Sequence, residues 1–175
     1  KNAMLANSVS RPGTCFRFRL NLRELDAWEL GAIVVALCPS PRWVDELLSA
    51  PVAPRDRARI DALLSESAAA IVERPDQPAM AIKLGYARPL GWGSVVLSMD
   101  VAVVHGGDNE IEGDALVELQ AAWVRALRDR LVASLGPGYA TWVRRVLTPW
   151  VEMHRFAGAP RADYPRSGEG SLAIA

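Results

Sequence analysis

Residues 83–99 read KLGYARPLGWGSVVLSM, a glycine-rich stretch that runs directly into an apolar, strand-like one. Its glycines, at positions 85, 91 and 93, have no Cβ, so the backbone there can approach another molecule closely. Two basic residues, Lys83 and Arg88, add positive charge to the same stretch. Together these features favour an anionic partner.

The stretch differs from the common nucleotide-binding motifs. No Gly-Lys-Ser or Gly-Lys-Thr ends it, which excludes a Walker loop. A strand follows the glycines where a dinucleotide-binding fingerprint requires a helix. The anion that this loop would hold therefore has to be inferred from the rest of the chain.

Residues 16–23 alternate strictly between apolar and polar side chains, with Phe, Phe, Leu and Leu on one side and Arg17, Arg19, Asn21 and Arg23 on the other. This period of two predicts a half-buried strand with one basic face. The basic face either keeps a sheet soluble or contacts phosphates. Both interpretations stay open.

Helices are predicted from their caps, apolar periodicity and breakers. Asp26 and Glu29 have the spacing of a capping box, which begins a helix that Pro39 stops. Further helices are expected at 43–48, 56–73 and 116–135, a strand at 95–104, and a short helix followed by a strand at 139–155, with Pro149 between them.

The 175 residues, half of them hydrophobic and 23% charged, suit one globular domain. Two predicted strands and several helices, with a helix directly after the first strand, suggest an α+β sandwich. We expect residues 1–14 to be a lead-in that begins with an expression-tag remnant, residues 15–156 the domain and residues 157–175 a Gly/Pro/Ser-rich tail. The chain has few strands for a complete sheet, which suggests either a fragment of a larger protein or a protein that completes its sheet with partners.

Net charge and cysteine content limit the partners. The formal net charge is zero, so no DNA contact through bulk electrostatics is predicted. Two cysteines without metal-ligand spacing predict a reduced, cytoplasmic protein. No apolar run is long enough to cross a membrane.

Catalytic chemistry is not evident. His105 and His154 have no nucleophile or carboxylate beside them in sequence, and we assign both a structural role. No catalytic residue, metal ligand or cofactor is predicted. The aromatic residues divide by context: Trp123 and Trp28 belong to the core or its edge, whereas Trp92 and Tyr86 either stack on a base or fill a pocket beneath the loop.

Three segments in order, residues 16–20, 26–37 and 83–95, resemble the RAMP superfamily of CRISPR-associated proteins, in particular the RAMP subunits of type III effector complexes. The resemblance lies in a strand, a helix reading ELGAIVVAL and the loop KLGYARPLGWGSV. It covers about a third of the chain.

The resemblance implies a ferredoxin-like, RRM-related fold, with an antiparallel sheet packed on helices, that binds CRISPR RNA alongside other effector subunits. Related proteins often start a further strand before the first one, which suggests that this chain is a carboxy-terminal RAMP module of a longer protein. The loop positions carried over are Lys83, Gly85, Arg88, Gly91 and Gly93. Backbone N–H groups and cations suit phosphates, although the glycines alternatively serve only tight packing of the loop against the first helix. The predicted RNA-binding residues are Arg17, Arg19, Lys83, Gly85, Tyr86, Arg88, Gly91, Trp92 and Gly93.

Two alternatives stay open. Some relatives cleave RNA, so the chain is alternatively a RAMP-type endoribonuclease, although its first-helix region contains no histidine. The third possibility is a scaffold subunit in which helices 26–38 and 116–135 dock neighbours without touching RNA.

Overall fold

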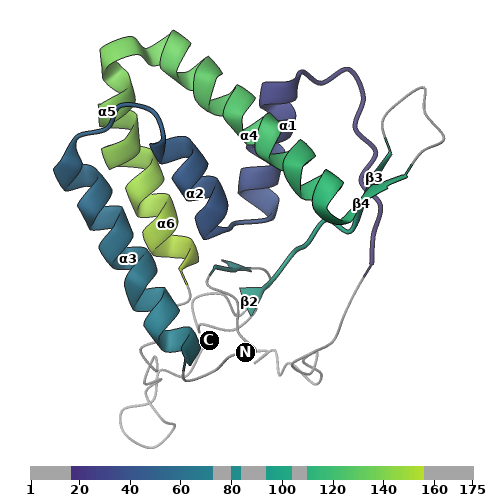
Figure 1. The fold of residues 1–175 in the computed structure, drawn as a ribbon, viewed down its shortest axis with the longest axis horizontal. Coiled ribbons are helices and arrows are strands. Elements are labelled where there is room, and N and C mark those ends of the chain that lie inside the picture. Colours follow the sequence, from purple (N-terminus) through teal and green to yellow (C-terminus); the bar gives the residue numbers. More distant parts are fainter. Residues whose placement is uncertain (1–16, 73–79, 84–93, 104–109, 156–175) are drawn as a thin grey trace, which may run out of the picture.

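The computed structural model describes residues 17–72, 80–83, 94–103 and 110–155, and Figure 1 shows how their helices and short strands are arranged. The described part of the chain has mixed α and β structure, so the predicted α+β class is confirmed. In chain order the elements are α1 (Ala27–Leu37), α2 (Pro41–Leu48), α3 (Pro54–Val72), β1 (Ile82–Lys83), β2 (Ser94–Val95), β3 (Val101–Val103), β4 (Glu110–Glu112), α4 (Gly113–Leu135), the 3-10 turn η2 (Gly136–Gly138), α5 (Tyr139–Trp142), the wide turn η3 (Val143–Leu147) and α6 (Thr148–His154).

Helix α1 begins where its cap predicts. Asp26 is the N-cap residue, and its backbone N–H donates to Oε2 of Glu29 at 2.8 Å. The helix packs along α4 through Gly31, whose position faces the backbone of Trp123. Glycine allows this approach because any Cβ at position 31 would meet the carbonyl group of that residue. The two helices form the main contact of the fold.

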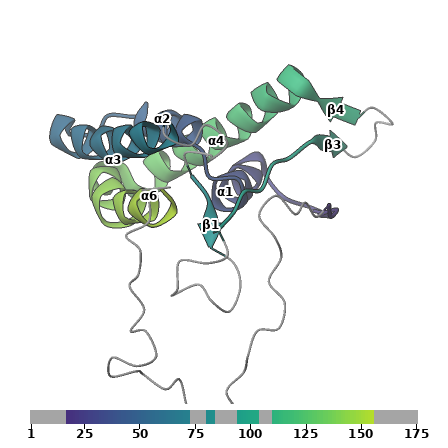
Figure 2. The same ribbon diagram turned by 90° about the horizontal axis from the view of Figure 1, so that it is seen from below.

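The core lies between α1, α2, α3, α4 and the C-terminal helices, whose arrangement Figure 2 shows. Helix α2 contributes most densely, with Trp43, Val44, Leu47 and Leu48 all buried. Its N-cap is Ser40, whose Oγ accepts from the backbone N–H of Arg42. The predicted helices at 43–48, 56–73 and 116–135 are confirmed, with starts two or three residues earlier than expected.

The segment from α5 to α6 is helical throughout, so the strand predicted after Pro149 is wrong. Proline has no N–H to donate to the preceding turn, which normally interrupts a helix. Here the turn before it is widened: the backbone N–H of Thr148 bonds to the carbonyl of Val143, and Oγ1 of Thr148 donates to the same oxygen at 3.0 Å. This π-type turn lets the helix pass the proline.

The strands form two separate antiparallel pairs. Ile82 pairs with Val95 and Lys83 with Ser94, while β3 pairs with β4. The continuous strand predicted at 95–104 is therefore wrong, because the chain leaves the first pair after Val95 and enters the second at Val101. The inward side also changes: Leu97 and Met99 are half-buried as expected, whereas Val101 and Val103 are exposed.

The strand predicted at 16–23 is also corrected. Residues 17–23 have no strand partner in the part of the chain that the structure describes, and their side chains are exposed. Alternation alone cannot make a strand, since its backbone groups need a neighbouring strand. Among the described residues, no helix is both long and apolar enough to cross a membrane.

Candidate functional site

The glycine-rich stretch begins and ends on paired strands. Lys83, the last residue of β1, lies opposite Ser94, the first residue of β2. This pairing brings together the two ends of the predicted RNA-binding loop. The other loop residues proposed for binding lie outside the described residues: Gly85, Tyr86, Arg88, Gly91, Trp92 and Gly93.

The base of the loop is fixed to the core. Met80, Ala81 and Ile82 are all buried, although they lead directly into a polar segment. The backbone N–H of Ala81 donates to the carbonyl of His154 at 2.9 Å, and Met80 forms a bridge with Arg155. The end of α6 thus holds the first strand of the loop in place.

This contact brings a basic residue to the site that sequence reasoning missed. Arg155 follows α6 and bridges to Met80, three positions before Lys83. No local signal in the sequence pairs these residues, because they are far apart along the chain. Only the packing of α6 against β1 reveals that a second cation lies beside the loop's base.

Arg17 and Arg19 stand apart from this group. Both are exposed, and the sheet that holds Lys83 contains β1 and β2 alone among the described strands. Figures 1 and 2 place residues 17–23 on the side of the molecule where β3 and β4 lie. The structure therefore does not bring the predicted basic strand and the loop together in one sheet.

The histidine and tryptophan at the end of α6 have structural partners. The His154 ring packs against Trp150 at an interplanar angle of 31°, with centroids 4.6 Å apart, and its Nδ1 lies 2.8 Å from the Trp150 carbonyl oxygen. These contacts give the His154 ring a structural role at the end of α6. His105, the other histidine, lies outside the described residues.

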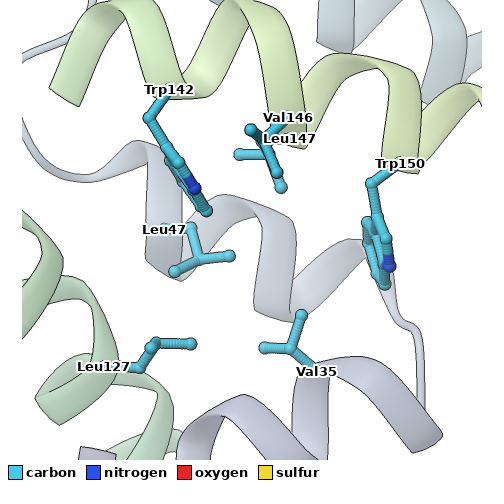
Figure 3. A pocket seen from close by; sticks show the side chains of 7 residues that line it. All are labelled: Val35, Leu47, Leu127, Trp142, Val146, Leu147 and Trp150. Carbon is cyan, nitrogen blue, oxygen red and sulfur yellow. The ribbon is translucent and has the colours of Figure 1, made fainter. Parts of the chain in front are cut away.

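An apolar hollow of roughly 100 Å³ opens beside the same helix (Figure 3). Its lining comes from α1, α2, α4 and the C-terminal helices: Val35, Leu47, Leu127, Trp142, Val146, Leu147 and Trp150. The indoles of Trp142 and Trp150 stand at either end of the Figure 3 view, with Val146 between them on the same helical run. Such a lining suits an apolar side chain and offers no acid, base or nucleophile.

Charged side chains of α2 and α4 form ion pairs between the two helices. Arg42 bonds to Glu118 at 2.7 Å, while Glu46 lies 3.3 Å from Arg125 and 3.9 Å from Arg128. Within these pairs the positive and negative charges neutralise each other at the surface. The described residues contain no group of three side chains that could hold a metal ion.

Burial suppresses the reactivity of two further groups. It raises the pKa of the Cys38 thiol, so the nucleophilic thiolate is disfavoured. It also raises the pKa of Tyr139 to about 12, and the hydroxyl of this residue donates to the Leu47 carbonyl at 2.6 Å. Both groups therefore stay neutral near pH 7.

Comparison with known proteins does not identify a relative. No family model, no curated protein and no solved structure matches the chain.

Proposed function

We propose that the chain is an RNA-binding subunit of a type III CRISPR effector complex. Its fold is then a ferredoxin-like RAMP domain, in which other subunits complete the short sheets. The glycine-rich stretch contacts the CRISPR RNA backbone through Lys83, Gly85, Arg88, Gly91 and Gly93. Tyr86 and Trp92 stack on bases, and Arg17 and Arg19 add phosphate contacts farther along.

One observation carries this proposal. The pairing of β1 with β2 brings together the ends of a stretch that contains glycines, aromatic residues and cations. Burial of Met80–Ile82 and the contact with α6 give this stretch a rigid base, which reduces the ordering cost of binding. Arg155 supplies a further positive charge beside that base. Cations and close backbone approach on a fixed platform suit a single-stranded phosphate backbone.

The test is the salt dependence of single-stranded RNA binding. Lys83→Ala combined with Arg88→Ala should weaken binding and flatten the slope of log K against log salt by about 1.4, since each lost contact with a single strand accounts for about 0.7. Fluorescence anisotropy over a salt series measures both quantities.

A matched control removes the same charge elsewhere. Arg55→Ala with Arg59→Ala changes two exposed cations at the start of α3. This double variant should leave the slope unchanged. Equal slopes for the wild type and the Lys83/Arg88 variant would remove the loop from the RNA path.

A scaffold role is the second candidate, because the hollow between Trp142 and Trp150 is open, apolar and suited to a side chain of another protein. In that case purified complexes carry the chain without nucleic acid. The ratio of absorbance at 260 and 280 nm, measured before and after removal of this subunit from the complex, separates the two roles.

A further inference from the structure

Residues 17–23 expose an apolar side that their sequence was expected to bury. Phe18 is 67% exposed, Leu20 51% and Leu22 39%. The segment is neither helix nor turn, and it has no strand partner among the described residues. Apolar side chains that alternate along an unpaired segment are typical of a strand that pairs with another chain.

The pair β3–β4 also lacks a neighbouring strand in the described part of the chain. Two strands alone are marginally stable in water, and in the described part of the chain no third strand joins them. On one side of the pair, Ala102 and Ile111 lie opposite each other and are half-buried. On the other side, Glu110 and Glu112 are exposed. Strand β4 therefore has one edge without a described partner strand, and along it two carboxylates on the exposed face alternate with one apolar residue on the half-buried face.

The unpaired segment complements this edge position by position. In an antiparallel register that places Phe18 opposite Ile111, Arg17 lies opposite Glu112 and Arg19 opposite Glu110. Opposite charges in directly facing positions stabilise a strand pair. The same register puts Phe18 on the half-buried side of the sheet and both arginines on the exposed side. A shift of one residue would destroy both matches at once.

We propose that residues 17–23 of one copy add as a strand to β4 of a second copy, and reciprocally, to form a twofold symmetric dimer. Both complementary elements belong to the same chain and lie on the same side of the molecule (Figures 1 and 2). A twofold axis therefore brings each segment to the other copy's β4 through one self-complementary surface.

The junction between the segment and α1 fits such an exchange. Glu24, which separates them, has a φ of 56°, a left-handed conformation that is unfavourable for a side chain other than glycine, asparagine or aspartate. Strained hinges of this kind favour strand exchange between copies.

The dimer goes beyond the proposed RNA-binding function and is compatible with it. A guanidinium has five N–H donors, so Arg17 and Arg19 can contact a carboxylate and a phosphate together. Self-association is tested on nuclease-treated protein without RNA. Its failure is therefore distinguishable from failure of the RNA-binding proposal.

The decisive experiment is a charge swap between two variants. The first carries Arg17→Glu and Arg19→Glu, and the second carries Glu110→Arg and Glu112→Arg. Sedimentation velocity should show a dimer for the wild type, and each variant alone should dissociate at least tenfold more readily because like charges face each other. An equimolar mixture should form a one-to-one heterodimer, since both of its interfaces again pair opposite charges. Native mass spectrometry identifies that species.

Folding does not confound this result, because all four substituted side chains are exposed, and circular dichroism of each variant checks it. A control with Arg55→Glu and Arg59→Glu on α3 should dimerise as the wild type does. A monomeric wild type at the highest soluble concentration overturns the proposal. So does dimerisation of both variants at wild-type strength, or a mixture that stays monomeric.

Discussion

Gly31 sets the distance between α1 and α4 at the scale of a single residue. A Cβ built there lies 2.6 Å from the Trp123 carbonyl carbon and 3.0 Å from Cβ of Leu127. The first of these contacts is with backbone, which cannot rotate aside. Gly31→Ala should therefore lower the free energy of unfolding by about 1–3 kcal/mol, despite the better helix propensity of alanine. Urea denaturation measures the change.

A second glycine provides the control. Gly138 has helical backbone angles, and the nearest atom to a Cβ built there is Leu135 Cβ at 3.9 Å. Gly138→Ala should leave stability unchanged or raise it slightly. If Gly31→Ala behaves like Gly138→Ala, α1 and α4 do not approach as closely as described.

Tyr139 couples stability to alkaline pH. Its pKa is raised to about 12 by burial, against an ordinary value of 10 in the unfolded chain. Between these two values the unfolded state binds fewer protons than the folded state, so stability falls as pH rises from 10 to 12. Below pH 10 the residue contributes no pH dependence. The slope reaches at most about 1.4 kcal/mol per pH unit for one such group.

Tyr139→Phe separates this effect from other titrations. It removes the hydrogen bond to the Leu47 carbonyl, so the variant should be less stable by about 1 kcal/mol at neutral pH. Its stability should nevertheless fall less steeply between pH 10 and 12. Parallel curves for both proteins would show that the hydroxyl titrates normally in the folded state.

At the scale of elements, the segment leading into β1 depends on α6. Met80 is 2% exposed and bridges to the residue that follows α6. Met80→Ala should lower the free energy of unfolding by about 2–5 kcal/mol, the range for truncating a buried side chain. Met153→Ala is the matched control, because Met153 is 63% exposed on α6 itself. Equal unfolding midpoints in urea for the two variants would contradict the anchoring of β1.

Helices α1 to α4 could be predicted from sequence, whereas α6 and the pairing of the strands could not. A helix satisfies its own backbone hydrogen bonds, so the capping pair Asp26 and Glu29 with an apolar stripe was enough to locate α1. A strand depends on a partner elsewhere in the chain. The alternation in residues 16–23 and 95–104 was real, but it did not say which segment lies alongside or where one pair gives way to another.

At the scale of the whole molecule, the candidate site was predictable only in its local part. Composition indicated the glycine-rich loop and its cations, and the pairing of Lys83 with Ser94 agrees with a loop between strands. Arg155 could not be found this way, because its place beside the loop follows from the docking of α6. A neutral net charge likewise conceals local basic groups, since ion pairs such as Arg42 with Glu118 neutralise charge elsewhere.

The wide turn at Val143–Leu147 also determines the direction in which the side chains of α6 point around the helix axis. An α-helix rotates by about 100° per residue, so Trp142 and Trp150, eight positions apart, would diverge by about 80° around a regular axis. The extra residue absorbed by the π-type turn makes them equivalent to seven positions, or about 20°. Both indoles therefore line one hollow. A single helical period therefore cannot describe the apolar positions on both sides of this turn, and each side has to be analysed with its own starting phase.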